Sequence, residues 1–413
     1  MKILFLSQYF PPEICAPAAR VSELCRYWAE KGEEITVITA FPNHPTGVIP
    51  DEYRGKKFMR EKVDRFDLLR SWIYPAPNRE FFKRLVCFFS FLLSSIYTAI
   101  FKAGKCDVVI ATSPQIFVGL SGWIVSVFKK APYVLEIRDL WPESAIELGV
   151  LKNRYLIALS RSLERFLYKH ADLLVAVSKS IRDAIVQSGI PANRVILLPN
   201  GINPELFKPG ERINRKRAQI QMKDQFIISY IGTHGMAHGL EVVVDAARIL
   251  KEEPRFHFLF IGEGAEKKKV IAYSQKLKLE NVTFLPSQPK SEIPEWYVAS
   301  DVCMVVLKDL PVFETVLPSK MFEIMACQRP TLMVARGECA EMVRDSRSGV
   351  VVPPGDPAGL ADAIRELADN EPGRAEMAQN GREYVLKYYD RRELAGRYLD
   401  HLYRLAGKTG KTG

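Results

Sequence analysis

The chain has 413 residues, which is too long for a single hydrophobic core and predicts two domains. Hydrophobic residues make up 47% of it and charged residues 26%, a balance that excludes a disordered or fibrous protein. The formal net charge is +10, and the seven scattered cysteines form no C-x-x-C pair, so we expect reduced thiols and no zinc site. The N-terminal apolar run is short and ends in prolines, so we expect no signal peptide.

The first forty residues have the pattern of a βαβ unit. An apolar run at 2–7 precedes a helical pattern at 18–31, and a second apolar run follows at 34–39. The loop 8–20 would lie at the carboxyl edge of a parallel sheet, where open α/β folds bind ligands. It lacks a G-x-G-x-x-G pattern, which disfavours a dinucleotide site.

A proline-rich segment at 41–53 has no periodic pattern and is predicted to be a loop without regular structure. His44 in this loop is either a ligand contact or a solvated histidine, and the composition favours the solvated one.

The next region is strongly basic. Residues 54–105 carry 12 Lys and Arg against 4 Asp and Glu, which suggests nucleic acid, anionic lipid or a phosphorylated substrate as a partner. Residues 85–101 are uncharged, and basic residues flank them on both sides: Arg79, Lys83, Arg84, Lys102 and Lys105. A spanning helix needs about 20 mainly apolar residues, and this one contains several Ser and Thr. A membrane-spanning helix and a buried helix remain alternatives, but the basic flanks favour a helix that lies at the interface of a membrane with anionic headgroups.

Two buried strands are predicted at 107–112 and 133–137, and the motif RDLWPES follows the second of them. Arg138, Asp139 and Trp141 would supply charge, a hydrogen-bond acceptor and a stacking surface for a polar ligand. The alternative is a salt-bridged loop that caps the next helix.

A turn-rich link at 199–210 separates this half from a second α/β pattern. Its strands are predicted at 225–232, 256–261, 282–285, 302–307, 331–334 and 350–352. The fold class is therefore α/β, with two doubly wound domains facing each other across a hinge.

Three strand ends of the second half carry candidate ligand-binding loops. Two are rich in glycine, at 232–235 and 262–264, and glycine lets backbone N–H groups approach a ligand closely. In the third, Ser319 is predicted to cap a helix whose N-terminus can hold a phosphate. Glu323, one turn further, can turn a carboxylate toward ligand hydroxyls, and His238 is either a cap or a source of positive charge.

These motifs together carry a family resemblance. They are PPE…APAAR (11–20), FPNHPTG (41–47), RDLWPES (138–144), LPNGINPELFKP (198–209), GTHGMAHGLE (232–241) and PSKMFEIMA (318–326). The chain resembles the retaining GT-B glycosyltransferases of family 4. It is most similar to the bacterial O-antigen and capsule branch, which includes N-acetyl-L-fucosamine transferases and colanic-acid relatives.

The resemblance implies a nucleotide-sugar donor on the second domain and an acceptor mainly on the first. Glu323 matches the glutamate that binds the ribose hydroxyls. Thr315 stands where the motif has its first glutamate, which positions the donor sugar, and we assign that role to the neighbouring Glu314. Thr233 and His238 match the arginine and lysine that neutralise the diphosphate, so His238, Lys320 or backbone amides must supply the charge.

The family's His-Asp pair matches Arg138 and Asp139. By this resemblance we expect Arg138 to stabilise the leaving diphosphate and Asp139 to orient a sugar. The predicted catalytic residues are therefore Arg138, Asp139 and Glu314. The predicted donor-binding residues are Gly232, Thr233, His234, His238, Gly262, Gly264, Thr315, Ser319, Lys320 and Glu323, with both residues of the 262–264 loop near the base. The predicted acceptor-binding residues are Glu13, Arg20, His44 and Trp141.

The expected reaction is retaining, metal-independent transfer from a UDP-linked amino sugar, with UDP-N-acetyl-L-fucosamine as the best candidate. The expected acceptor is a lipid-diphosphate-linked saccharide at the cytoplasmic face of the inner membrane, where the chain would be peripherally bound; no cofactor or nucleic acid is expected. The expected domains are 1–200 and 201–385, with a C-terminal helix at 386–413 packing on the first domain. A GT-B sugar-nucleotide epimerase and a nucleic-acid-binding protein are the alternatives, and a periplasmic-type sugar-binding module is disfavoured.

Overall fold

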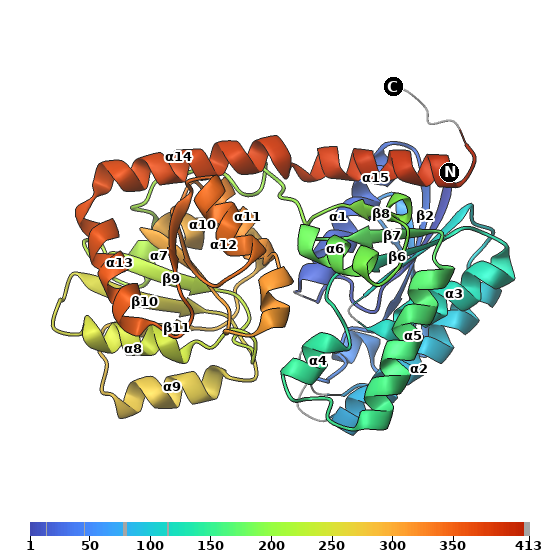
Figure 1. The fold of residues 1–413 in the computed structure, drawn as a ribbon, viewed down its shortest axis with the longest axis horizontal. Helices are drawn as coiled ribbons and strands as arrows, with labels where there is room; N and C mark the ends of the chain where they lie inside the picture. The colour runs from blue at the N-terminus through green and yellow to red at the C-terminus, as the bar shows by residue number, and fades with distance from the viewer. Residues whose placement is uncertain (14, 45, 77–80, 114, 409–413) are drawn as a thin grey trace. The chain divides into compact units, whose positions relative to one another are not determined.

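The computed structural model describes residues 1–13, 15–44, 46–76, 81–113 and 115–408, so Arg79 of the basic flank lies outside the described residues. The chain divides into two compact units. Unit 1 comprises Met1–Pro199 together with the segment from Arg391, and unit 2 comprises Asn200–Asp390. Each unit is one sheet covered by helices on both faces (Figure 1).

Unit 1 contains an eight-stranded sheet in the order β3-β4-β2-β1-β5-β6-β7-β8. Its strands are β1 Lys2–Leu6, β2 Glu34–Ala40, β3 Phe58–Val63, β4 Phe66–Ser71, β5 Val108–Thr112, β6 Tyr133–Ile137, β7 Leu173–Ala176 and β8 Val195–Leu197. All neighbours pair in parallel except β3, which is antiparallel to β4. The sequence patterns did not predict the β3–β4 hairpin, because β3 has no buried residue and forms a solvated edge.

The helices of unit 1 lie on two sides of this sheet. They are α1 Ala16–Glu30, α2 Phe81–Phe101, α3 Ile116–Lys129, α4 Glu143–Glu147, α5 Arg154–His170, α6 Lys179–Gln187 and α15 Arg391–Leu405, with 3-10 turns η1 Asp51–Tyr53 and η2 Ala192–Arg194. The η1 turn lies inside the segment predicted to be irregular. Apolar residues of α1 and α15 form one core with the sheet, and those of α2, α3, α5 and α6 form the other.

The C-terminal helix α15 is an integral part of unit 1. Trp28 of α1 is fully buried, and its indole N–H donates to the Ala395 carbonyl at 2.9 Å. The Trp28 ring also packs edge-on against Tyr398 at 5.3 Å between centroids. Large aromatic groups of this kind dominate core stability, so α15 holds unit 1 together across nearly the whole length of the chain.

Unit 2 contains a six-stranded, fully parallel sheet in the order β11-β10-β9-β12-β13-β14. Its strands are β9 Phe226–Ile231, β10 Phe256–Ile261, β11 Val282–Leu285, β12 Val302–Val306, β13 Thr331–Val334 and β14 Gly349–Val352. Its helices are α7 Arg215–Gln219, α8 Glu241–Ile249, α9 Lys267–Lys276, α10 Ile293–Ala299, α11 Ser319–Ala326, α12 Glu338–Asp345, α13 Pro357–Asp369 and α14 Glu371–Tyr388, with 3-10 turns η3 Lys290–Glu292 and η4 Pro311–Thr315. Strand order reverses between β9 and β12, and such a switch point is where open α/β sheets bind ligands.

Helix α2 has one buried and one exposed face, both apolar. Phe91, Ser95 and Ala99 are fully buried, and Ser71 of β4 donates to Thr98 at 2.8 Å, so this face belongs to the core of unit 1. On the other face, apolar side chains recur every fourth residue and are exposed: Leu85, Phe89, Leu93, Tyr97 and Phe101. Lys83–Phe101 is the one described helix long and apolar enough to cross a membrane, with a mean hydropathy of 1.7. Helix α2 is therefore buried on one face only, and its predicted place at a membrane interface stays a prediction.

Candidate active site

The donor half-site predicted in unit 2 lies at the switch point of its sheet. The loop after β9 (232–240) and the segment from β12 through η4 to α11 flank the reversal, and the loop after β10 (262–266) adjoins them. These are the three segments that the sequence patterns predicted to carry ligand contacts.

The two glycine-rich loops are held together through their backbones. His234 N–H donates to the Glu263 carbonyl at 2.9 Å, and Glu266 N–H donates to the His234 carbonyl at 2.9 Å. A Cβ on Gly262, whose φ is +142°, would lie 1.9 Å from the Gly232 carbonyl oxygen, and one on Gly264 would lie 2.3 Å from the His234 oxygen. These positions therefore require glycine because the two backbones cross in contact.

A Gly262→Ala variant should lose about 2 kcal/mol or more of unfolding free energy, since the methyl meets backbone in a positive-φ conformation. Urea unfolding followed by fluorescence measures this. Gly104→Ala is the matched control, because a Cβ there meets nothing within 4 Å. Equal stability of the two variants would show that the loops can separate freely.

Lys320 lies in the first turn of α11 with a buried ammonium group. Its Nζ is 3.8 Å from the centroid of the Tyr230 ring and has no hydrogen-bond partner among the described residues. Burial lowers the pKa of Lys320 to about 7, and the nearby Glu323 carboxylate opposes this shift. A Cβ on Gly232 would lie 2.7 Å from Nζ, so the ammonium reaches the β9 loop. An unneutralised cation is therefore held against an aromatic face beside the candidate phosphate loop.

The two histidines of the β9 loop are neutral. His234 has no exposed surface, and neither ring nitrogen has a partner among the described residues. Burial, followed by the charges of Lys267 and Lys320, lowers its pKa to about 4. Burial lowers the pKa of His238 to about 3, and its Nδ1 lies 3.1 Å from the Val306 carbonyl oxygen. Without ligand, His238 is therefore uncharged, and Lys320 and the backbone amides are the other predicted sources of positive charge.

Glu323 lies one turn after Lys320 on the same helix. Its Oε2 accepts a hydrogen bond from the Tyr297 hydroxyl at 3.1 Å. Burial raises the pKa of Glu323, while Lys290 and Tyr297 hold it down. The carboxylate is thus fixed beside the ammonium, an arrangement suited to a ligand with both hydroxyl and phosphate groups.

Ser319, Thr315 and Glu314 are the other predicted residues of this segment, and Ser319 differs from its prediction. Ser319 does not cap α11: Pro318 stands at the cap position and Ser319 is the first helical residue, with no side-chain cap bond. Thr315 donates its hydroxyl to the Val312 carbonyl at 2.8 Å. Glu314 is exposed, and its backbone packs so closely on Gly337 that a Cβ there would lie 2.2 Å from the Glu314 oxygen.

In unit 1, Arg138 and Asp139 follow β6 directly. The Arg138 backbone N–H donates to Ser113 Oγ at 2.8 Å, and the buried guanidinium Nη1 has no partner among the described residues. Burial, and then repulsion from Arg20, lowers the pKa of Arg138 to about 10. Burial raises the pKa of Asp139, and Arg138 opposes this. Arg138 is thus buried with spare donor capacity, while Glu143 of the same motif forms a surface salt bridge with Arg161 at 2.9 Å.

Glu13 and Arg20, predicted as acceptor contacts, hold the loops of unit 1. Glu13 accepts the backbone N–H groups of Asn43 at 3.0 Å and His44 at 2.9 Å. Arg20 pairs with the buried Glu136 at 3.2 Å and donates to the Leu198 and Pro199 carbonyls at 3.2 and 3.0 Å. Any acceptor contact must be made in addition to these bonds.

His44 is not a solvated loop histidine. Its ring lies edge-on to Tyr9 at 5.0 Å between centroids, and burial lowers its pKa to about 4. The proline-rich loop therefore packs onto the loop after β1, and His44 is a neutral group at the carboxyl edge of the sheet.

Comparison with known proteins identifies the family. A model for group 1 glycosyl transferases matches residues 212–384, and a model for the glycosyl transferase 4-like domain matches residues 16–201. The chain belongs to this glycosyltransferase family. Among curated relatives, the putative colanic acid biosynthesis glycosyl transferase WcaI of Escherichia coli (strain K12) is 28% identical, over 79% of this chain and 81% of WcaI. The probable glycosyltransferase WbjE of Pseudomonas aeruginosa is 26% identical, over 72% of this chain and 76% of WbjE.

The fold of this glycosyltransferase is GT-B. The structure of Anabaena HepE in complex with UDP-glucose matches it with a TM-score of 0.75 and 18% identity, over 98% of this chain and all of HepE. The predicted family and fold are therefore confirmed.

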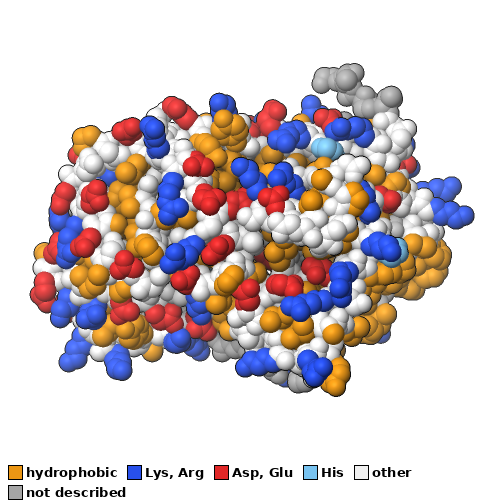
Figure 2. Space-filling view, viewed as in Figure 1, with side chains coloured by type: hydrophobic (Ala, Val, Ile, Leu, Met, Phe, Trp, Pro, Cys, Tyr) orange, Lys and Arg blue, Asp and Glu red, His pale blue; other side chains and the backbone are white. Residues whose placement is uncertain are grey.

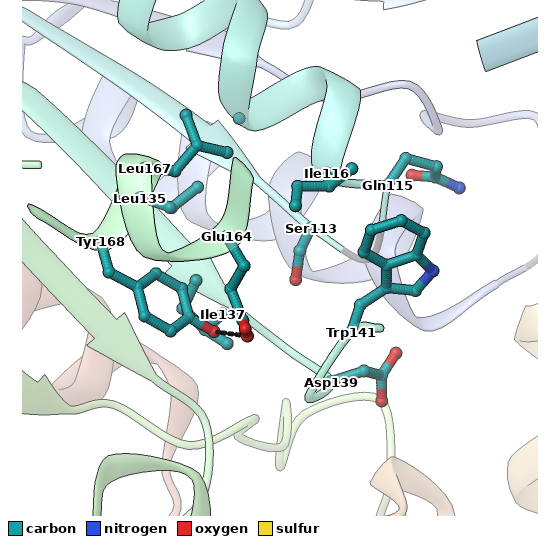
Figure 3. A pocket seen from close by; sticks show the side chains of 11 residues that line it. Ser113, Gln115, Ile116, Leu135, Ile137, Asp139, Trp141, Glu164, Leu167 and Tyr168 are labelled. Atoms are coloured by element: carbon teal, nitrogen blue, oxygen red, sulfur yellow. Dashed lines mark hydrogen bonds between the residues drawn. The ribbon is translucent and has the colours of Figure 1, made fainter. Parts of the chain in front are cut away.

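Sequence patterns missed three side chains of this glycosyltransferase that shape its half-sites. Tyr230, the platform for Lys320, and Tyr297, the donor to Glu323, look like ordinary core aromatics in the sequence. Glu164 of α5 carries no motif, yet it lines a cavity with Asp139 and Trp141 (Figure 3). Among the described residues, no group of three or more His, Cys, Asp or Glu is placed to hold a metal ion.

Proposed function

We propose that this glycosyltransferase moves an amino sugar, with retention, from a UDP-linked donor to a lipid-diphosphate-linked saccharide during bacterial surface polysaccharide synthesis. UDP-N-acetyl-L-fucosamine is the best donor candidate. The observation that carries the proposal is the placement of both Lys320 and Glu323 on α11, at the switch point and beside two glycine loops in backbone contact. The UDP-glucose complex of HepE, and the colanic-acid role in the name of WcaI, support the donor class and the pathway.

The proposed chemistry uses the residues of unit 2 to hold the donor. The Glu323 carboxylate accepts hydrogen bonds from the ribose hydroxyls, and the Lys320 ammonium leaves the Tyr230 ring for the diphosphate. The positive end of the α11 dipole adds to this charge. As the bond from the sugar to the diphosphate breaks, negative charge grows on the phosphate oxygen, and a fixed cation there lowers the barrier. Arg138 and Asp139 remain the predicted catalytic residues of unit 1.

A panel of UDP-, GDP- and TDP-linked sugars, tested by isothermal titration calorimetry on the full chain, examines this proposal. We expect binding of UDP-sugars, with the amino sugars tightest and with no loss of affinity in EDTA. Tighter binding of GDP- or TDP-sugars would overturn the assigned base, and the absence of binding to all of them would overturn the donor role.

The acceptor class is proposed from the surface of unit 1. Besides the exposed apolar face of α2, unit 1 exposes apolar side chains on α3, namely Val127 and Phe128, and on α5, namely Tyr155 and Leu159. Figure 2 shows hydrophobic side chains gathered over this part of unit 1, with Lys and Arg beside them. The basic neighbours include Lys83, Lys102, Lys105 and Lys130. An apolar face of this kind with a basic border suits the interface of an anionic membrane, where a lipid-linked acceptor resides.

Reversing this charge should release the protein from membranes. The change is Lys83, Arg84, Lys102 and Lys105 to Glu, and each basic residue near an anionic surface contributes about 1 kcal/mol of binding. We expect flotation with vesicles containing phosphatidylglycerol to fall by about a hundredfold or more.

The matched control reverses four exposed lysines of unit 2: Lys223, Lys251, Lys268 and Lys276. It makes the same change in net charge away from the apolar face, so its flotation should stay near that of the wild type. Equal partitioning of all three proteins would contradict the membrane proposal.

A further inference from the structure

A small cavity lies at the carboxyl ends of β5 and β6, between α3 and α5 of unit 1. Its volume is about 30 Å³, and apolar side chains form most of its wall: Ile116, Leu135, Ile137 and Leu167. Asp139 and Trp141 stand at the same cavity, directly after β6 (Figure 3). One predicted acceptor contact, Trp141, and one predicted catalytic residue, Asp139, are therefore part of the cavity wall.

The wall also carries polar side chains, namely Ser113, Gln115 and two carboxyl groups, Asp139 and Glu164. Glu164 projects from α5, and its Oε1 accepts a hydrogen bond from the Tyr168 hydroxyl at 2.8 Å (Figure 3). Burial raises the pKa of Glu164 to about 7. Burying a carboxyl group costs free energy of desolvation that an apolar side chain at this position would avoid. The chemistry proposed above assigns no role to Glu164. The group is thus available to a ligand.

The size and chemistry of the cavity select a small group with both an apolar and a donor part. A water-sized group needs roughly 10–15 Å³, so the cavity excludes a sugar ring and takes only the outer atoms of a ring substituent. An acetamido group fits this description, since it offers a methyl to the apolar wall and an N–H donor to the carboxylate. A methyl alone would add no donor to the one that Tyr168 already gives Glu164, and a hydroxyl alone would leave the apolar part of the wall without contact.

We propose that this cavity is a specificity pocket for the acetamido group of an N-acetylated acceptor sugar. In it, Glu164 accepts the amide N–H and Ile116, Leu135 and Leu167 contact the methyl. The ring of the same sugar then lies beside Trp141 and Asp139. This inference rests on the proposed function, because it assumes that unit 1 binds the acceptor.

Matched short-chain acceptors test the pocket in the full-length protein. The probes are farnesyl diphosphate-linked N-acetylglucosamine and glucose, measured by calorimetry with UDP saturating. We expect the wild type to bind the N-acetylated member about tenfold more tightly or better, as a hydrogen bond to a charged group predicts. Glu164→Leu should abolish most of this preference, and Ile116→Phe, which fills the cavity, should abolish it as well. Both variants should bind UDP like the wild type, which shows that unit 2 is intact.

The outcomes separate this inference from the proposed function. If both acceptors bind equally to the wild type while UDP-sugars still bind, the pocket is wrong and the donor role stands. If the variants change only the preference between UDP-N-acetylglucosamine and UDP-glucose, the acetamido group belongs to the donor and the acceptor assignment is overturned. If no UDP-sugar binds at all, the proposed function fails independently of the acceptor data.

Discussion

Lys320→Met should lower kcat/KM for the nucleotide-sugar donor by about a hundredfold or more, because it removes the cation predicted to meet the diphosphate. His234 and His238 are neutral in the ligand-free fold, and Thr233 carries no charge, so Lys320 is the predicted donor contact of unit 2 that supplies positive charge. Methionine keeps the length and apolar stem of the side chain against Tyr230. The loss should therefore be one of charge, with little change in packing.

The same lysine predicts proton uptake on donor binding. The pKa of Lys320 is about 7 in the ligand-free fold, so one unit above that value roughly a tenth of the molecules carry the ammonium. A diphosphate beside the group raises its pKa, so a proton is taken up when the donor binds above pH 7. UDP-glucose suits the measurement, since its esterified diphosphate does not titrate in this range. Calorimetry at pH 8 in buffers of different ionisation enthalpy should show uptake approaching one proton, and Lys320→Met should show none.

The lowered pKa of Lys320 also makes the stability of the ligand-free protein depend on pH. The folded pKa of Lys320 lies below the value expected in the unfolded chain, so the unfolded state binds more protons between the two pKa values. The ligand-free protein should therefore gain stability as pH rises through this window, and Lys320→Met should remove that gain. Lys268→Met, at an exposed site on α9, is the control for both measurements. A Lys320→Met protein with normal donor affinity would show that the diphosphate is held by other groups.

The strand framework was predictable because it depends on local composition. The strands Tyr133–Ile137, Phe256–Ile261, Val282–Leu285 and Thr331–Val334 have their predicted bounds, since each is an apolar run that ends in turn-forming or polar residues. The β3–β4 hairpin was missed because Phe58–Val63 is an edge strand with no buried residue and three consecutive charged residues, Arg60, Glu61 and Lys62. Its charges were interpreted as part of a basic zone instead of part of a strand.

The site was predictable in its positions and not in its electrostatics. Loops at the ends of parallel strands must gather at one edge, so the predicted segments of unit 2 do flank its switch point. The charge state of His44, His234 and His238 depends on burial, which a residue type does not show. The contact between Lys320 and Tyr230 joins residues far apart in the chain, and no local sequence pattern predicts it.

Glu323→Gln should abolish discrimination between UDP and its 2′,3′-dideoxy analogue. A carboxylate that accepts two ribose hydroxyls forms charge-assisted bonds, and each contributes about 1.5–3 kcal/mol. Wild-type protein should therefore prefer UDP by about a hundredfold or more. Glutamine keeps the shape of the side chain but loses the charge and one acceptor oxygen. The ribonucleotide should lose most of its affinity, while the dideoxy analogue should bind as before.

Tyr297→Phe is the graded control for this experiment, because the Tyr297 hydroxyl at 3.1 Å orients Oε2 and is not itself predicted to touch the ligand. Its removal should weaken the ribose preference by about tenfold or less, since the carboxylate keeps its charge but loses one fixed bond. Glu314→Gln changes an exposed carboxylate nearby and should leave the ribose preference intact. Because Glu314 is predicted to contact the donor sugar, the effect of Glu314→Gln should appear only when the affinity for UDP-sugars is compared with the affinity for UDP. If Glu323→Gln keeps the wild-type preference, the ribose contact is wrong; if Glu314→Gln changes it, the two carboxylates have exchanged their predicted roles.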